Sequence, residues 1–500
     1  MKIGIAAIPL TLAFMVEAGA LGVKPDVSED RVVSPLKVGL ERIGTIRPRL
    51  SGTISDSNWT LGCEVLDRDF ADFEEYKDLV SPLGIKTVRL QGGWAKCERE
   101  KGRYDFSWLD RIVDYVRAHG MEVLLETGYG NPIYNGGGSC DIAGGFPSSE
   151  EGLAAWDDWV DAISRHFSER VRDWAMWNEP DLHINSRPKT IEEIAAFNVR
   201  TAKIIKRNRP DARIGGLSLM REDPVYFEKC LKAIGRDIGL FEWFIYHGYT
   251  VAPESAYANV EKLKSVLARY APNARMRQGE NGCPSEMGLF FGLSHIPWSE
   301  YSQAKWDMRR MLGDLGHDVQ SSLFTICDYN HKDREVNLKG LLRANEDRQV
   351  IDIKMAYYAV QNVANIFDCR LERVRDSTFG TRDMTISTYE YRMSDGRPVL
   401  VFWTHADEVA KIPPVKGKQG APEYIAEYKR PGDSFDTRQV AFRYRGAPLK
   451  DPVWVDMLTG GIYAFPQRRQ IVHSTGLTFV NVPVYDSPCL LTERTVVLHD

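Results

Sequence analysis

The strongest constraint on the fold is an alternation of short apolar runs with longer helical patterns, repeated eight times after residue 50. The apolar runs that we expect to form strands are Trp59–Val65, Thr87–Gln91, Glu122–Thr127, Val171–Trp177, Arg213–Leu217, Trp243–His247, Arg275–Gly279 and Ser322–Cys327. Several of them are almost continuously apolar, which is typical of parallel strands that helices cover on both faces. The helical patterns between them include Trp108–His119, Gly152–Phe167, Ile191–Asn208, Val260–Tyr270, Tyr301–Leu315 and Lys354–Ile366.

Eight strand–helix units over about 315 residues predict a (β/α)8 barrel, or TIM barrel, with some long loops. We expect it to occupy residues 51–366. The main alternative is an open doubly wound sheet, which usually has fewer strands and a phosphate-binding loop after the first strand.

The rest of the chain predicts a second domain. A chain of 500 residues is too long for one core, because single cores stop growing at roughly 250–300 residues. Beyond residue 366, alternating runs separated by Gly, Pro and Asp favour an antiparallel β-sandwich over residues 367–500. Its expected strands are Met384–Tyr391, Val399–Trp403, Val453–Asp456 and Thr478–Val482. The segment Lys411–Gly420 is expected to be an exposed loop, and residues 21–50 could add a strand to the sandwich.

The first 20 residues have the pattern of a signal peptide. Lys2 precedes the apolar run Ile3–Val16, and Ala18-Gly19-Ala20 has the A-x-A form of a cleavage site. We therefore expect cleavage after Ala20 and a secreted or periplasmic protein. An apolar strand or anchor is the alternative, but the run is shorter than the about 20 residues of a membrane-spanning helix, and no later run predicts a membrane span.

Eight cysteines are too sparse for a scaffold built on disulfides. An exported chain could still oxidise some of them. Cys97 and Cys140 follow the second and third expected strands, so we expect their loops to meet above the barrel, where the two thiols could form a bridge.

Charge and motifs exclude several classes of function. The net charge of −5 predicts no basic surface for nucleic acid. The sequence contains no P-loop, HExxH or EF-hand pattern, and its histidines are scattered singly. We therefore expect neither a cofactor nor a catalytic metal, while a structural calcium stays open.

Two glutamates stand where a barrel carries its chemistry, at the carboxyl ends of strands. The fourth expected strand ends in Trp177-Asn178-Glu179-Pro180, and the seventh ends in Gly279-Glu280. Cleavage of a glycosidic bond needs such a pair, because one carboxylic acid protonates the leaving oxygen while the other carboxylate attacks the anomeric carbon. We interpret Glu179 as the general acid/base and Glu280 as the nucleophile. In a retaining pair, the carboxyl groups lie about 5–5.5 Å apart.

Asn178-Glu179-Pro180 together with Glu280 resembles the arrangement of the 4/7 superfamily, or clan A, of (β/α)8 glycoside hydrolases. The tracts Arg89–Trp94, Gly102–Phe106 and Trp108–Asp110, with the trailing sandwich, are most similar to the family 39 group of β-xylosidases and α-L-iduronidases, or to a near relative. The resemblance covers residues 55–366 and, more weakly, Pro452–Tyr463. The sequence departs from the family pattern at Gly128–Gly138, after the third strand, so the resemblance does not define the sugar specificity.

The resemblance implies supporting roles for four residues. Asn178 should bond the sugar 2-hydroxyl, and Arg89 should hold Glu280 ionised. Tyr249 could donate a hydrogen bond to the nucleophile, and His247 ends the same strand. The alternatives are a structural ion pair for Arg89 and a packed core histidine for His247.

Aromatic residues near strand ends could stack on sugar rings. Trp94 and Tyr129 are the best candidates, because each follows a strand, although ordinary core packing is the alternative.

Taken together, the sequence predicts a retaining glycoside hydrolase acting on a carbohydrate substrate through a covalent glycosyl-enzyme. A non-catalytic carbohydrate-binding protein on the same scaffold is one alternative. A transglycosylase, which would use the same residues with a different acceptor, is another.

Overall fold

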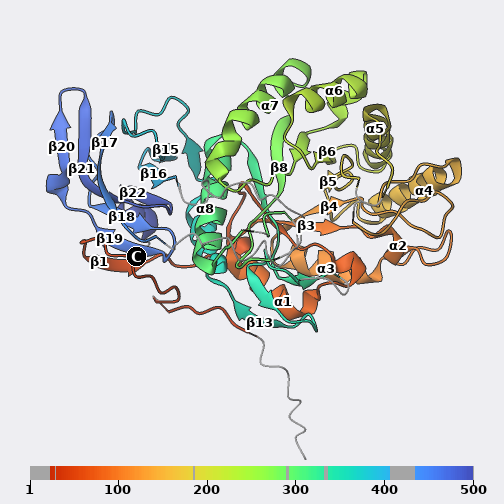
Figure 1. Cartoon of the computed structure of the whole chain (residues 1–500), viewed down its shortest axis with the longest axis horizontal. Coiled ribbons are helices and arrows are strands. Elements are labelled where there is room, and N and C mark those ends of the chain that lie inside the picture. The colour runs from red at the N-terminus through yellow and green to blue at the C-terminus, as the bar shows by residue number, and fades with distance from the viewer. Residues whose placement is uncertain are drawn as a thin grey trace, which may run out of the picture.

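The computed structural model describes residues 23–498, except 29, 143, 184–185, 289–291, 295, 332–335 and 406–433 (Figure 1). The expected signal peptide and the expected loop Lys411–Gly420 lie outside the described residues.

Eight parallel strands close into a barrel in the order in which they occur along the chain. They are β2 (Trp59–Gly62), β3 (Thr87–Gln91), β4 (Glu122–Glu126), β5 (Asp173–Ala175), β6 (Arg213–Leu219), β7 (Trp243–Tyr246), β8 (Arg275–Asn281) and β9 (Gln320–Leu323). The helices that follow these strands are α1 (Phe73–Val80), α2 (Trp94–Cys97), α3 (Ser107–Ala118), α4 (Glu150–His166), α5 (Ile191–Asn208), α6 (Pro224–Ile234), α7 (Tyr257–Tyr270), α8 (Glu300–Gly316) and α9 (Met355–Ile366). The predicted TIM barrel is thus confirmed, and each expected strand overlaps an observed one.

Helix α5 illustrates how the sequence sets the bounds of these elements. Thr190 and Glu193 form a capping box, in which the Thr190 hydroxyl accepts from the Glu193 N–H at 3.1 Å and the Glu193 carboxylate accepts from the Thr190 N–H at 2.8 Å. Ile194, Phe197 and Thr201 then recur at helical spacing and are buried. The helix therefore begins at its cap and turns one apolar face toward the barrel.

Strand β1 and the strands that follow α9 form two antiparallel sheets, as expected for a sandwich. The larger has the strand order β1-β19-β18-β22-β16-β15-β14 and the smaller β17-β21-β20. Their bounds are β1 (Arg42–Thr45), β14 (Leu371–Arg373), β15 (Ile386–Met393), β16 (Pro398–Thr404), β17 (Arg438–Tyr444), β18 (Pro452–Asp456), β19 (Gly461–Ala464), β20 (Gln470–His473), β21 (Gly476–Val484) and β22 (Cys489–Glu493). Phe402, Phe442 and Phe479 belong to one buried hydrophobic cluster that joins the two sheets.

The larger sheet is buried on both faces. Along β16, Leu400 and Phe402 belong to the cluster of the sandwich, whereas Val399, Val401 and Trp403 belong to the cluster of the barrel. This alternation follows from the two-residue period of a strand. In Figure 1, α8 stands between these strands and the barrel. The sandwich therefore packs on the barrel as a second layer.

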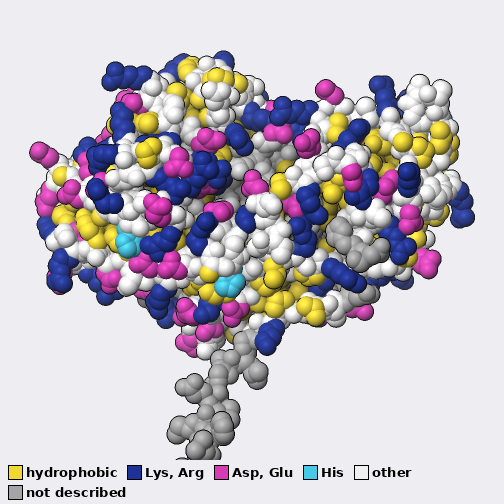
Figure 2. Space-filling model, turned by 180° about the vertical axis from the view of Figure 1, so that it is seen from behind, with side chains coloured by type: hydrophobic (Ala, Val, Ile, Leu, Met, Phe, Trp, Pro, Cys, Tyr) yellow, Lys and Arg dark blue, Asp and Glu magenta, His cyan; other side chains and the backbone are white. Residues whose placement is uncertain are grey.

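The surface carries interspersed charge. On the face shown in Figure 2, basic and acidic side chains alternate over the molecule. Among the described residues, none of the helices combines the length and apolar character needed to cross a bilayer.

Candidate active site

Polar side chains from six barrel strands meet at the carboxyl end of the barrel. Most lie in the last residues of a strand or in the loop directly after it, where TIM barrels place their chemistry. They are Glu64 after β2, Arg89 and Gln91 in β3, Glu126 in β4, Asn178 and Glu179 after β5, His247 and Tyr249 after β7, and Gln278 and Glu280 in β8. The structure thus brings six of the eight predicted site residues together. Tyr129 lies beside this group, since besides burial the charges of Glu126 and Glu280 act to raise its pKa, whereas Trp94 lies in α2.

Glu179 and Glu280 face each other beside one imidazole. The Nδ1 atom of His247 lies 2.8 Å from Glu179 Oε1 and 3.5 Å from Glu280 Oε2. One oxygen of each carboxylate and a ring nitrogen of His247 all lie within 4.8 Å of one another. The two glutamate side chains keep 11% and 10% of their surface exposed, whereas that of His247 is fully buried. A substrate can therefore reach the carboxylates, while the imidazole contacts them from the buried side of the site.

Glu280 is surrounded by groups that favour its ionised form. Burial alone would raise the pKa of this carboxyl group, but the charges of His247 and Arg89 and a hydrogen bond from Tyr249 outweigh burial and hold the pKa below its ordinary value. The Tyr249 hydroxyl donates to Oε1 at 2.9 Å and an Arg89 Nη1–H donates to Oε2 at 3.1 Å. Glu280 is therefore set up as a carboxylate.

Glu179 has the opposite character. Burial raises the pKa of its carboxyl group above the ordinary value and the charge of Glu280 adds to this, although the hydrogen bond and charge of His247 oppose the rise. Its backbone φ of 47° lies in the left-handed region, directly before Pro180. Strained backbone of this kind persists where the surrounding structure holds it, and it clusters at functional sites. The Glu179 N–H donates to the Ser218 carbonyl at 3.0 Å, which ties the strained residue to β6.

Arg89 holds a larger charge cluster than the sequence predicts. Besides Glu280, its guanidinium donates to Glu64 Oε1 at 2.7 Å, to Glu126 Oε2 at 2.7 Å and to Asn178 Oδ1 at 3.0 Å. The side chain is only 3% exposed, so these bonds form away from water. The expected ion pair with Glu280 is present, but one guanidinium serves three carboxylates. It also fixes the Asn178 amide with its oxygen turned inward.

Three residues near the site escaped the sequence analysis. Glu64 lies two residues after the end of β2, so the same strand-end rule that finds Glu179 could have found it. Glu126, at the end of β4, lies in the Arg89 cluster. Lys339 is buried with its ammonium 5.7 Å from the centre of the Tyr249 ring, and burial lowers its pKa to about 8. No motif marks Lys339, because it lies in a turn of the long connection between β9 and α9.

The two aromatic candidates are buried against other side chains. Trp94 is completely buried in α2, where its ring stacks between Tyr134 and Trp159 at centroid distances of 5.7 and 5.8 Å. Tyr129 is 2% exposed, and the guanidinium of Arg68 covers its ring at 4.5 Å. Both rings are thus buried and packed against other side chains in this structure, and stacking on substrate stays a prediction.

The expected bridge between Cys97 and Cys140 is also absent, since both thiols are free. Cys97 is buried, and its thiol donates to the Gly92 carbonyl at 3.2 Å. It therefore faces the loop that it helps to fold rather than the neighbouring loop.

Glu179, His247 and Glu280 place three candidate metal-ligand atoms within 4.8 Å of one another. Both oxygens of Glu280 already accept hydrogen bonds, from Tyr249 and from Arg89. A cation on Glu280 would also face the positive guanidinium. These residues fit proton transfer better than metal binding.

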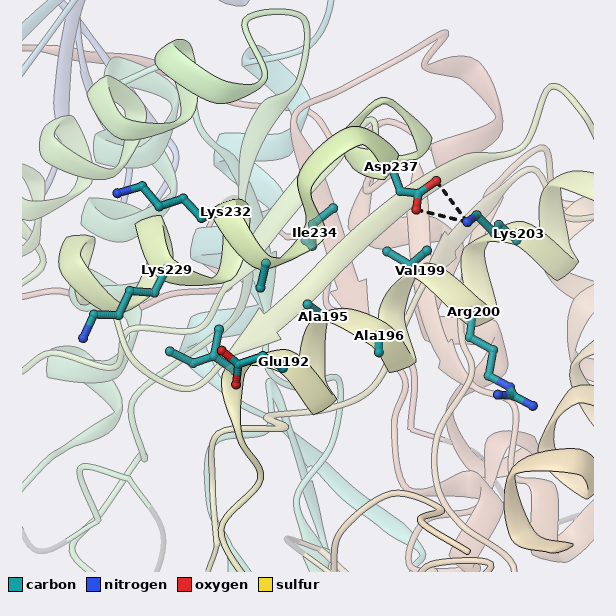
Figure 3. A pocket seen from close by; sticks show the side chains of 12 residues that line it. Glu192, Ala195, Ala196, Val199, Arg200, Lys203, Lys229, Lys232, Ile234 and Asp237 are labelled. Atoms are coloured by element: carbon teal, nitrogen blue, oxygen red, sulfur yellow. Dashed lines mark hydrogen bonds and ion pairs between the residues drawn. The ribbon is translucent and has the colours of Figure 1, made fainter. Parts of the chain in front are cut away.

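A separate groove lies on the outside of the barrel, between α5 and α6 (Figure 3). It has a volume of about 760 Å³ and is lined by helix side chains, including an ion pair between Lys203 and Asp237. It contains no residue from a strand end, and it plays no part in the site described above.

Sequence comparisons find short similarities to glycoside hydrolases. The family Glyco_hydro_42, described as beta-galactosidase, matches residues 68–133. A beta-xylosidase of Geobacillus stearothermophilus is 28% identical over 121 residues, covering 23% of this chain and 24% of that protein. Beta-galactosidase BgaA of Clostridium cellulovorans is 34% identical over 61 residues, covering 12% and 9%. The chain thus spans a quarter or less of the length of these curated relatives.

Solved structures match over most of the chain. A family 39 glycoside hydrolase from Bacteroides cellulosilyticus WH2 has a TM-score of 0.59 at 16% identity, covering 90% of this chain and 83% of that one. A monomeric beta-xylosidase from Caulobacter crescentus CB15 has a TM-score of 0.57 at 15% identity, covering 90% and 97%. A GH30 endoxylanase from Clostridium papyrosolvens C71 has a TM-score of 0.56 at 12% identity, covering 92% and 98%. The expected resemblance is confirmed: the chain has the fold shared by the clan A glycoside hydrolases of families 39 and 30, and part of its barrel is similar in sequence to the beta-galactosidases of a further glycoside hydrolase family.

Proposed function

We propose that the protein is a retaining glycoside hydrolase that cleaves O-glycosidic bonds by double displacement. One observation carries the proposal: two facing carboxyl groups have their pKa values moved in opposite directions, with an oxygen of each within 4.8 Å of the other. A retaining pair stands about 5–5.5 Å apart, whereas an inverting pair needs about 6.5–9.5 Å to admit a water molecule. The geometry therefore supports retention.

In the first step, Glu179 gives its proton to the leaving oxygen while Glu280 attacks the anomeric carbon. The bond from that carbon to the leaving oxygen breaks, and an ester between the sugar and Glu280 forms. Asn178, fixed by Arg89 at 3.0 Å, stands beside the acid and is suited to bond the sugar 2-hydroxyl.

In the second step, Glu179 removes a proton from water, which attacks the same carbon and releases the Glu280 carboxylate. The structure supplies a reason for the change of role. Because the charge of Glu280 raises the pKa of Glu179, esterification of Glu280 removes that influence and lowers the pKa of Glu179. The acid of the first step thereby becomes the base of the second.

The test follows the anomeric configuration of the product by NMR. The substrates are 4-nitrophenyl β-D-xylopyranoside and 4-nitrophenyl β-D-galactopyranoside, because the similar proteins are a beta-xylosidase and beta-galactosidases. We expect the first product to keep its configuration, and a 2-deoxy-2-fluoro analogue to label the peptide that contains Glu280. Inverted product, or a label elsewhere, would remove the mechanism. No turnover of a wider aryl glycoside panel would favour a carbohydrate-binding protein, and transfer to added alcohol in preference to water would favour a transglycosylase.

We also propose that residues 1–20 direct export, on the strength of the apolar run and the A-x-A site. Expression of the full chain with its own leader tests this proposal. Export predicts mature protein outside the cytoplasm that begins at Leu21, and intact Met1 in the cytoplasm would contradict it.

A further inference from the structure

The strand that carries Glu280 is irregular where the glutamate sits. The parallel pairing of β8 with β9 changes register between Gln278 and Asn281. The pairing of β8 with β7 ends at Tyr246 and Gln278. An irregularity of this kind re-aims a side chain, but it also interrupts the ladder that holds neighbouring strands together. The carbonyl groups of His247 and Glu280 lie beyond the last pair of the β7–β8 ladder.

One buried carboxamide links these two carbonyl groups. The Nε2 atom of Gln278 donates to both the His247 carbonyl and the Glu280 carbonyl. Its Oε1 atom accepts from the Asn281 amide. A glutamine has two N–H donors, and both are used here. The side chain is completely buried, so no water competes for these bonds.

The carboxamide is itself anchored from outside the strand. The Asn281 amide also donates to Ser321 Oγ at 3.2 Å, and that hydroxyl donates to Asp314 Oδ2 at 2.7 Å. Asp314 forms an ion pair with Arg310 at 3.1 Å within α8. All five side chains of this network are buried. Gln278 is therefore held in place by β9 and by the helix that stands against the sandwich.

We propose that Gln278 is a positioning residue. Its carboxamide substitutes for the backbone hydrogen bonds that end at Tyr246 and Gln278, and so fixes the end of β7, which carries His247, against the end of β8, which carries Glu280. The inference rests on the proposed function and adds a residue to it. His247 follows β7 and lies 2.8 Å from Glu179, after β5, and 3.5 Å from Glu280, in β8. The contact with Glu280 depends on the spacing between the ends of β7 and β8. Misplacement by 1 Å in such a site can cost about 100-fold in rate.

A substitution that keeps volume and removes the amide tests the proposal. Gln278→Met fills the same space without a donor, and Gln361→Met is its matched control. Gln361 is also buried, in α9, where its amide donates to the Pro82 carbonyl at 2.7 Å. We expect similar losses of Tm in both variants. Only Gln278→Met should lower kcat on an aryl glycoside, by about 100-fold, with KM changed less than about threefold. Equal kinetic effects in the two folded variants would overturn the proposal.

A second measurement does not depend on turnover. The charges of Glu280 and Glu179 raise the pKa of His247, against the effects of burial and of Arg89. If Gln278 holds the imidazole in place, its loss should let the ring move away and lower the pKa of His247. NMR titration of ¹³C-labelled histidine, assigned with a His247→Gln variant, measures this directly. An unchanged His247 titration in folded Gln278→Met would reject the positioning role, even if the wild type hydrolysed no glycoside and the proposed function failed on its own.

Discussion

His247 Nδ1 lies 2.8 Å from Glu179 Oε1, so the group interpreted as the acid has an imidazole as its hydrogen-bond partner. The same nitrogen lies 3.5 Å from Glu280. His247 is thus a common partner of two carboxyl groups whose roles differ, and its removal should affect both of them in the same direction.

Removal of His247 should move the whole pH profile toward higher pH. His247 lowers the pKa of Glu280 and, against burial, that of Glu179. In His247→Gln, both pKa values rise, so the acid limb, which reports ionisation of Glu280, and the alkaline limb, which reports deprotonation of Glu179, both shift upward. The pH dependence of kcat/KM measures this. His166→Gln, which removes a surface histidine paired with Asp110 at 2.7 Å, is the control and should shift neither limb. A downward shift of either limb in His247→Gln would contradict the assignment.

Substitution of Tyr249 should shift the acid limb of the pH profile of kcat/KM without shifting the alkaline limb. Its hydroxyl bonds Glu280 Oε1 at 2.9 Å, and this bond lowers the pKa of Glu280. In Tyr249→Phe, we expect the acid limb alone to move to higher pH, because the ionised nucleophile loses a donor. Tyr115→Phe is a matched control, since Tyr115 donates to Asp78 at 2.7 Å on the surface. If the alkaline limb moved and the acid limb did not, the roles of Glu179 and Glu280 would have to be exchanged.

Loss of either carboxylate should give a distinct rescue by azide. In Glu280→Ala, turnover should nearly vanish and azide should restore it with inverted product, because the anion attacks the face that the nucleophile leaves vacant. In Glu179→Ala, a good leaving group should still allow the glycosyl-enzyme to form. Azide should then release a product of retained configuration. NMR of the glycosyl azides distinguishes the two outcomes, and wild-type rates in both variants would end the proposal.

Arg89 should be a stability residue as well as a site residue. In Arg89→Met, Glu64, Glu126 and Glu280 lose their shared counter-charge, and a broken buried pair costs about 3–5 kcal/mol in the free energy of unfolding. Loss of this counter-charge should raise the folded-state pKa of Glu280, which Arg89 lowers, and should raise further that of Glu64, which burial already holds above its ordinary value. The loss should therefore be smallest below about pH 4, near the unfolded pKa of glutamate, and grow as the pH rises.

Urea unfolding at pH 4 and pH 7 measures this loss. Arg213→Met, which leaves only Asp173 unpaired and whose guanidinium is partly exposed, should cost less at both pH values. A loss in Arg89→Met that did not depend on pH would show that packing, not charge, sets the effect.

The sequence predicts the barrel well because its signal is local. Each strand is an apolar run bounded by polar residues, and the strand-end rule leads directly to Glu179 and Glu280. The alternating strands β15 and β16 of the sandwich are predicted for the same reason. By contrast, β17 (Arg438–Tyr444) shows no apolar run, since mainly Phe442 and Tyr444 are buried, and its pairing with β21 depends on tertiary contacts.

The surroundings of the site depend on contacts that no local pattern encodes. Trp94 follows a strand, as a sugar-binding residue would, but the chain turns at once into α2 and buries the ring against α4. Gln278 is two residues from Glu280 in the sequence, yet its function depends on the end of a different strand. Positions at strand ends along the sequence identify the catalytic candidates. The residues that position those candidates are determined by tertiary contacts.

The pairing of β1 with β19 has a consequence for the order of events during synthesis. Arg42–Thr45 leaves the ribosome before any part of the barrel, but its partner Gly461–Ala464 is made only near the end of the chain. We therefore expect β1 to remain unpaired while the barrel folds. The barrel should then be complete while the surface that the sandwich later covers is still exposed. Synthesis of Gly461–Ala464, rather than completion of the barrel, should then be the step that makes the protein resistant to proteases. A gene truncated after residue 366 should for the same reason yield an aggregating product and not a smaller enzyme.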